Sequence, residues 1–152
     1  GQCWATRVTG RALAFLKQVR RDEPFVLVVS YDEPHPPMMC PSPFMERFVG
    51  VEVPIPQTIA EDLSAKPELQ RRNARWHSER WNLGPETLAE GIRHWYAGTA
   101  YVDAEVGRLL DALDAGLAEE TTIIYTCDHG DLLGAHGMCG KGAMMYEETN
   151  RV

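Results

Sequence analysis

The longest regular pattern in the sequence is an apolar repeat with steps of three and four residues, which predicts a helix from Pro85 to Ala115–Gly116. Proline is favoured in the first turn of a helix, Glu86 suits the positive end of the helix dipole, and glycine can end a helix. The helix leads directly into an apolar run at Thr121–Thr126. The residues of the repeat are Leu88, Ile92, Trp95, Thr99, Val102, Val106, Leu109 and Leu113.

Two apolar runs predict strands buried in the interior. Phe25–Val29 is apolar without alternation, which is typical of a strand covered on both faces in a parallel sheet. Thr121–Thr126 is rich in β-branched residues and is predicted to be the second strand. Apolar spacing over Thr9–Arg20 predicts a further helix before the first strand. The order helix, strand, loop, helix, strand indicates an α/β domain.

The remaining segments give weaker patterns. Asp32–Pro43 contains five prolines and is predicted to be an extended loop. A short helix is expected around Phe44–Phe48, and residues 50–83 are expected to form an irregular excursion with short helical pieces. The arginine-rich, mixed-charge stretch Lys66–Arg80 is interpreted mainly as a solvated loop or helix face.

Composition limits the classes of function. The chain has 152 residues, of which 44% are hydrophobic and 24% charged, as in a single globular domain. Its formal net charge of -7 argues against nucleic acid as a partner, and its apolar runs are too short to span a membrane. Its four cysteines show no CxxC spacing and do not decide a cellular compartment. Neither end resembles a chain terminus or a signal segment, so we expect a fragment of a longer protein.

Both predicted strands are followed by loops with chemically useful side chains. His35 lies among prolines after the first strand, and Asp128, His129 and Lys141 follow the second. Ligands of open α/β sheets bind beyond the carboxyl ends of the strands. If the two strands are parallel in one sheet, His35 and Asp128 emerge at the same edge and share a site.

Asp128 and His129 can supply a carboxylate oxygen and an imidazole nitrogen to one divalent ion. The alternative is an Asp turn beside an ordinary surface histidine. The many glycines that follow favour the metal, because they let the backbone pack closely around a ligand. Lys141 in the same loop offers a cation for a sulfate or phosphate oxygen, or is simply an exposed lysine. His35 can donate a proton or bind an anion, or is only a turn histidine.

A zinc site is a further alternative. Cys127, His129, His136 and Cys139 include two thiols and two imidazoles. Their spacing matches no common zinc module, and alternation along the strand turns Cys127 away from Asp128. The zinc interpretation is therefore disfavoured.

Taken in order, five segments of the chain resemble the sulfatase family of the alkaline-phosphatase-like superfamily. The resemblance covers most of the chain and is weakest over residues 50–83. The segments are PFVLVVSYDEPHPP, CPSPF, HWYAGTAYVDAEVGRLLDALDAGL, TTIIYTCDHGDLLGAHG and GKGAMMYEE.

The resemblance implies part of a mixed, mainly parallel sheet flanked by helices, with one divalent cation. That cation is most often calcium, with manganese or zinc possible. Asp128 and His129 match metal ligands, His35 matches the histidine that contacts the sulfate or protonates the leaving group, and Lys141 matches the lysine that contacts the sulfate ester. His136 lies in the family's G-x-H-G loop in a supporting position. Tyr101 and Asp103 match positions where packing is expected.

Several family features have no counterpart in the sequence. The family's nucleophile is a formylglycine made in a C/S-x-P/A-S-R motif, and Cys40-Pro41-Ser42-Pro43 departs from that motif. The paired aspartates that complete the metal site are also absent. We therefore expect residues 1–152 to be a partial sulfatase-like catalytic domain whose nucleophile precedes Gly1. On its own it should bind metal weakly, because two ligands cannot satisfy an ion that takes six or more oxygens.

The expected reaction of the parent protein is hydrolysis of a small-molecule or carbohydrate sulfate ester, without nucleic acid or membrane partners. One alternative is a phosphodiester or phosphonate ester hydrolase of the same superfamily. Another is a non-catalytic fragment or binding protein that keeps the scaffold. The sequence gives no information on oligomeric state.

Overall fold

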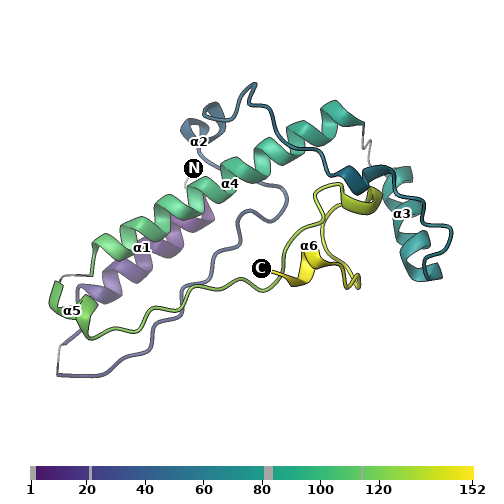
Figure 1. Ribbon diagram of the computed structural model, residues 1–152. Helices are drawn as coiled ribbons and strands as arrows, with labels where there is room; N and C mark the ends of the chain where they lie inside the picture. The colour runs from purple at the N-terminus through teal and green to yellow at the C-terminus, as the bar shows by residue number, and fades with distance from the viewer. Residues whose placement is uncertain (1–2, 21, 81–83, 114) are drawn as a thin grey trace. The chain divides into compact units, whose positions relative to one another are not determined.

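The computed structural model describes residues 3–20, 22–80, 84–113 and 115–152 (Figure 1). Its residues fall into two compact units. The first combines residues 1–51 with 93–123, and the second combines residues 52–92 with 124–152. The elements are α1 (Trp4–Leu16), α2 (Ser42–Glu46), η1 (Gln57–Ala60), α3 (Glu68–Arg80), α4 (Pro85–Asp111), α5 (Ala115–Glu119), η2 (Ala135–Gly137) and α6 (Glu147–Asn150), where η marks a 3₁₀ helix.

In the first unit, α1 lies along the part of α4 that belongs to the same unit (Figure 1). The buried face of α1 is made of small residues, Ala5, Thr9 and Ala12, at helical spacing. Tyr101 of α4 is 1% exposed, and its hydroxyl accepts a hydrogen bond of 2.8 Å from the Thr6 amide. Small side chains on one helix therefore leave room for a large aromatic side chain on the other.

A closed polar network joins the same two helices. The Thr6 hydroxyl donates to the Glu105 carboxylate at 2.9 Å, so the Tyr101 hydroxyl is the donor in its 2.5 Å contact with Thr6 Oγ1. Arg108 donates to the other oxygen of Glu105 at 2.5 Å. Each polar group in the network has a partner, which is what makes burial of Glu105 tolerable.

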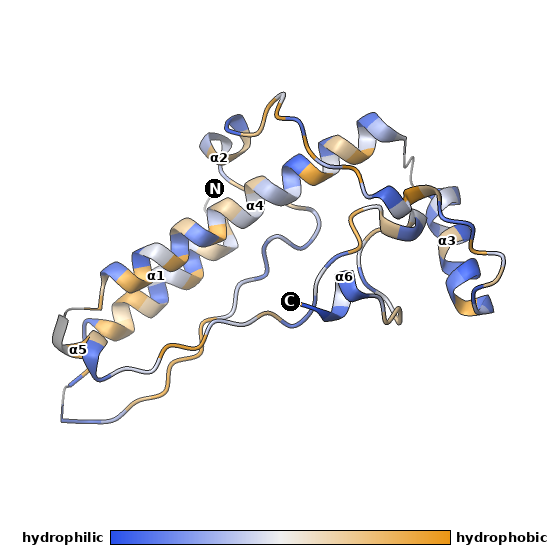
Figure 2. Cartoon of the chain, viewed as in Figure 1, coloured by the Kyte–Doolittle hydropathy of each residue, from blue (hydrophilic) through white to orange (hydrophobic). Residues whose placement is uncertain are grey.

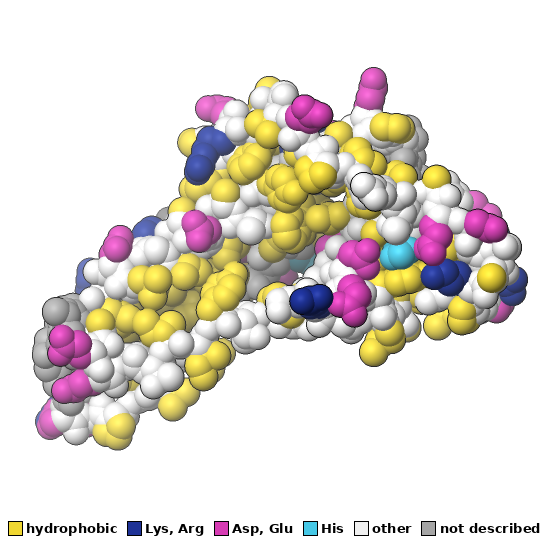
Figure 3. Space-filling model, viewed as in Figure 1, with side chains coloured by type: hydrophobic (Ala, Val, Ile, Leu, Met, Phe, Trp, Pro, Cys, Tyr) yellow, Lys and Arg dark blue, Asp and Glu magenta, His cyan; other side chains and the backbone are white. Residues whose placement is uncertain are grey.

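The two predicted strands are extended but form no ladder within the residues that the structure describes. In the first, Val26 is 90% and Val28 is 84% exposed; in the second, Ile124 is 82% and Tyr125 is 79% exposed. The apolar residues of both segments are coloured as hydrophobic in Figure 2, and hydrophobic side chains are visible on the face shown in Figure 3. The prediction of strands in a mixed, mainly parallel sheet is thus not confirmed here, because a strand exists only when a neighbouring strand pairs with its backbone.

Two helices have other boundaries than those predicted from the sequence. The helix predicted at Thr9–Arg20 begins at Trp4 and ends at Leu16. Its buried residues are Ala5, Thr9 and Ala12, not the leucines of the predicted spacing. The helix around Phe44–Phe48 is shifted to Ser42–Glu46.

The long helix α4 ends at Asp111, four residues before the predicted Ala115. The amides of Ala112 and Leu113 donate to carbonyls three residues back, at 3.2 and 3.1 Å, which tightens the last turn. Gly116 lies within α5 instead of ending α4.

The second unit is built around the glycine-rich loop, residues 130–142. Its hydrophobic cluster consists of Leu132, Ala135, Met138 and Met144, with Ala74 and Tyr146 packed against it. Both η1 and α3 contact η2. Residues 50–83, predicted to be irregular, contain a regular helix of 13 residues, α3, which supplies Ala74.

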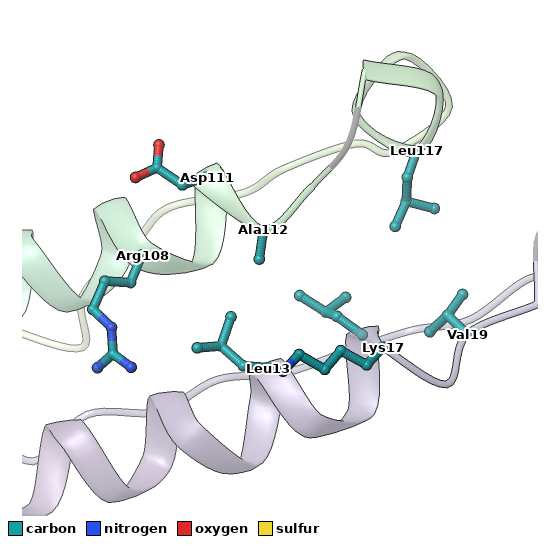
Figure 4. Close-up of a pocket in the computed structure, with 8 residues that line it drawn as sticks. Leu13, Lys17, Val19, Arg108, Asp111, Ala112 and Leu117 are labelled. Atoms are coloured by element: carbon teal, nitrogen blue, oxygen red, sulfur yellow. The ribbon is translucent and has the colours of Figure 1, made fainter.

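The first unit also contains a groove of about 660 Å³ between the end of α1, the end of α4 and α5 (Figure 4). Leu13, Val19, Ala112 and Leu117 contribute its apolar wall, and Arg108 and Asp111 lie at its rim. None of the four predicted site residues lines it. Within the described residues, no helix combines the length and hydropathy that membrane crossing requires.

Candidate active site

Asp128 and His129 follow the extended segment Thr121–Thr126 and present their side chains together. The Asp128 side chain is 86% exposed, and its Oδ1 accepts a hydrogen bond of 3.0 Å from the His129 amide. His129 Nε2 lies 3.4 Å from Asp128 Oδ2. The other ring nitrogen, Nδ1, donates to the carbonyl of Gly130 at 2.9 Å.

This arrangement fixes the tautomer of a neutral His129. Because Nδ1 carries the proton, Nε2 has the lone pair and faces a carboxylate oxygen. Metal-binding histidines commonly donate their second nitrogen to a backbone carbonyl, which orients the ring. The pair therefore fits two adjacent ligands of one divalent cation. Among the described residues no group of three or more His, Cys, Asp or Glu side chains could hold a metal ion.

The backbone around this pair is fixed by close packing against the C-terminal segment of the chain. The Gly130 amide donates to the Thr149 carbonyl at 3.0 Å. A Cβ atom at Gly130 would lie 2.0 Å from the carbonyl oxygen of Glu148, so only glycine permits this approach. The position of His129 therefore depends on the neighbouring glycine.

Asp131 shapes the glycine-rich loop from inside. Its Oδ1 accepts hydrogen bonds of 2.9 Å from the amides of Leu133 and Gly140. These bonds close the loop on itself immediately before Lys141. The Asp131 carboxylate thus stabilises the backbone of the loop by accepting these two hydrogen bonds.

Lys141 is held between two glycines in the left-handed region, Gly140 at φ 73° and Gly142 at φ 77°. Its side chain is half-buried, and no carboxylate of the described residues forms an ion pair with it. An ammonium group in this state can bind an anion without first breaking a salt bridge. Asp128, His129 and Lys141 all belong to the second unit.

His136 lies at the centre of a polar cluster in the same unit. It is 8% exposed, and its Nδ1 donates to Glu61 of the segment after η1 at 2.5 Å, while Nε2 lies 3.5 Å from Glu148. Its ring stacks on Tyr146 with centroids 3.7 Å apart. Lys66 pairs with Glu61 at 3.1 Å and lies 5.7 Å from the Tyr146 ring centroid.

The electrostatics of this cluster follow from its contacts. The hydrogen bond from His136, followed by that from Lys66, holds the pKa of Glu61 below its ordinary value. The carboxylate of Glu61 in turn raises the pKa of Lys66. Burial raises the pKa of the Tyr146 hydroxyl. The contacts of His136 and Lys66 with Glu61 therefore hold the loop that carries Lys141 against the segment around η1.

His35 belongs to the first unit, in a turn where its amide donates to the Asp32 carbonyl at 3.0 Å. Its imidazole is exposed, and Nδ1 donates to the Pro36 carbonyl at 2.8 Å. This bond leaves Nε2 as the nitrogen that can exchange a proton with a ligand. Because His35 and the other three residues lie in different units, their convergence on one site remains a prediction from topology.

The zinc alternative gains no support from the described residues. His136 is engaged by Glu61 and Glu148, and Cys127 is exposed. Burial raises the pKa of the Cys139 thiol, which disfavours the thiolate that zinc requires. These side chains therefore do not assemble a tetrahedral set.

The partners of the glycine-rich loop carry no mark in the sequence. Glu61 and His77 lie in the stretch expected to be irregular, yet both contact the glycine-rich loop; the Cys139 amide donates to His77 Nδ1 over a long 3.5 Å. This bond requires a neutral His77, in agreement with a pKa that burial lowers. No local pattern marks either residue, since each is more than sixty positions from its partner.

Comparison with known proteins shows the family. The sequence profile of the sulfatase family, "Sulfatase", matches residues 1–152. The chain belongs to the sulfatase family.

Two relatives and one solved structure illustrate the match. Uncharacterized sulfatase YidJ of Escherichia coli (strain K12) is 38% identical over 155 residues, which cover 98% of this chain and 30% of that protein. Iduronate 2-sulfatase of Homo sapiens is 30% identical over 149 residues, covering 88% of this chain and 26% of that protein. The chain thus spans about 30% of the length of these curated relatives.

A solved structure of a protein in complex with its substrate D-glucosamine-2-N,6-O-disulfate superposes with a TM-score of 0.82 at 21% identity, covering 97% of this chain and 41% of that one. The described part of this chain therefore has the fold of a portion of that larger chain.

Proposed function

We propose that this chain is part of a sulfuric ester hydrolase and supplies one portion of its active site. The observation that carries the proposal is the pair Asp128–His129, whose two lone-pair atoms lie 3.4 Å apart within a chain matched throughout by the sulfatase family. Lys141, without a carboxylate partner among the described residues, belongs to the same unit. A sulfated carbohydrate is the proposed class of substrate, in keeping with the relatives acting on iduronate and glucosamine sulfates.

Each of the four residues has a separate role in the proposed reaction. Asp128 Oδ2 and His129 Nε2 would bind one divalent cation, most often calcium, with manganese or zinc possible. Such a cation, when bound, stabilises negative charge on the ester oxygens. Lys141 would bind a sulfate oxygen through its ammonium group. His35, whose Nδ1 proton is held by Pro36, would pass a proton from Nε2 to the leaving oxygen.

The family's formylglycine nucleophile is proposed to lie outside residues 1–152. Two cation ligands and one lysine bind an ion and an anion but do not break an ester bond. The 152-residue chain is therefore expected to bind calcium at about millimolar affinity or weaker and to show no turnover. Calorimetric titration of the chain with calcium and with manganese, in parallel with Asp128→Asn, measures this binding.

The activity itself is tested on the protein that contains this chain, with 4-nitrophenyl sulfate as substrate and 4-nitrophenyl phosphate and bis(4-nitrophenyl) phosphate as comparisons. We expect sulfate ester turnover, and a loss of about 100- to 1000-fold in kcat for Lys141→Ala. Glu147→Gln is the matched control, because that side chain is 82% exposed and touches only Arg151 among the ion pairs described. Preferential turnover of a phosphate diester would replace the proposal with the phosphodiesterase alternative.

A further inference from the structure

The arginine-rich helix α3 has two sides with different partners. Asn73 and His77 turn toward the glycine-rich loop: Asn73 Nδ2 lies 3.7 Å from Met144 Sδ, and His77 accepts the Cys139 amide. Arg71 and Arg75 both donate to Glu68, at 2.7 and 2.8 Å. These contacts account for the structural part of the helix.

A second set of side chains on α3 makes no contact of this kind with the loop or with Glu68. Arg72, Trp76 and Arg80 stand four residues apart and so form one row on the helix surface. Arg72 and Arg80 are exposed, and within the described residues no carboxylate pairs with either. Trp76 is 45% exposed, and the guanidinium of Arg80 lies 4.9 Å from its ring centroid.

Charge makes this row unusual in the chain. The protein has a formal net charge of -7, yet α3 holds four arginines against two glutamates. The two arginines of the row are the ones that pair with no carboxylate among the described residues. A guanidinium is planar and always charged, and it binds oxyanions with two parallel hydrogen bonds. An exposed indole offers an apolar face with a negative quadrupole, which suits the C–H groups of a sugar ring.

We propose that Arg72, Trp76 and Arg80 form a docking surface for a linear sulfated oligosaccharide, with sulfate groups on the two guanidinium groups and a sugar ring on the indole. The nine residues from Arg72 to Arg80 span about 12 Å of helix, which is long enough for more than one sugar. Since α3 packs against the loop that carries Lys141, a chain bound here lies in the same unit as that lysine. The inference rests on the proposed function for its substrate class.

Binding is tested on the 152-residue chain with a heparin-derived tetrasaccharide, its desulfated counterpart and a uridine octanucleotide, by calorimetry at low and moderate salt. We expect the sulfated tetrasaccharide alone to bind, more weakly as salt rises. Arg72→Gln, Arg80→Gln and Trp76→Ala should each weaken binding by about fivefold or more. Arg75→Gln is the matched control, because it removes one arginine of the same helix outside the row.

Each result decides the proposal. Equal losses in Arg75→Gln and the row variants would show that only the overall charge of α3 matters, and would overturn it. Equal binding of the desulfated sugar, or tighter binding of the octanucleotide, would overturn it as well. Circular dichroism of each variant separates loss of binding from loss of folding. Because binding needs no turnover, its failure leaves the sulfatase proposal intact, and failure of sulfate hydrolysis leaves the binding result intact.

Discussion

His136 Nδ1 donates a 2.5 Å hydrogen bond to Glu61, and this contact joins the glycine-rich loop to a segment 75 residues away in the sequence. His136 adopts a left-handed backbone conformation, with φ 57° and ψ 25°, which non-glycine residues rarely do. Its side-chain partners therefore hold a loop conformation that the backbone alone disfavours.

Replacing His136 with alanine should destabilise the second unit. The change removes a hydrogen bond to a charged group and the stacking on Tyr146, and we expect a loss of about 1–3 kcal/mol in the free energy of unfolding. Urea denaturation followed by circular dichroism measures it. The exposed His35 provides the matched control, and an equal loss for His35→Ala would contradict the assignment.

The pH dependence of stability should reflect Glu61. Its pKa in the folded state lies below the ordinary value of 4.5, so the folded state binds fewer protons than the unfolded state in this range. The contribution of Glu61 is therefore complete above pH 4.5 and is lost as the pH falls through the lowered pKa. Thermal midpoints measured from pH 7 to about pH 3 should fall less steeply in Glu61→Gln than in the parent chain. A parallel fall in both would refute this role.

Substitution of Gly130 by alanine should be strongly destabilising. The new Cβ would meet the Glu148 carbonyl oxygen at 2.0 Å, so either the loop or the C-terminal segment must move and the 3.0 Å bond to Thr149 is lost. We expect a cost of about 2–4 kcal/mol. Gly91→Ala, in open space within α4, should instead be neutral or stabilising by up to about 1 kcal/mol. Calcium titration of Gly130→Ala would show whether the displacement also weakens the Asp128–His129 pair.

Tyr101 should contribute to the stability of the first unit through its hydroxyl. Tyr101→Phe leaves the half-buried Thr6 amide without its acceptor, which costs about 1–3 kcal/mol. Tyr125→Phe is the control, since Tyr125 is 79% exposed. Both are compared by urea denaturation, and equal midpoints for the two variants would mean that the Thr6 amide finds another partner.

The sequence by itself determined the features that depend on neighbouring residues. The periodic apolar repeat and Pro85 marked α4, because a helix closes its hydrogen bonds within four residues. The Asp128-His129-Gly130 turn and Lys141 were visible as motifs, and their order along the chain revealed the family later shown by the match over residues 1–152. The roles of His35, Asp128, His129 and Lys141 are still predictions.

Only the tertiary structure decided the features that depend on distant residues. α3 was expected only as a short helical piece or a solvated loop or helix face, because its apolar side is little more than Ala74 packed on the loop cluster, with mostly charged residues around it. Glu61 and His136 form a hydrogen bond although they are 75 positions apart in the sequence, and no local pattern predicts such a contact. The strands predicted at Phe25–Val29 and Thr121–Thr126 are not confirmed, because no partner strand pairs with either segment among the described residues. A helix satisfies its own backbone, but a strand needs a partner from elsewhere.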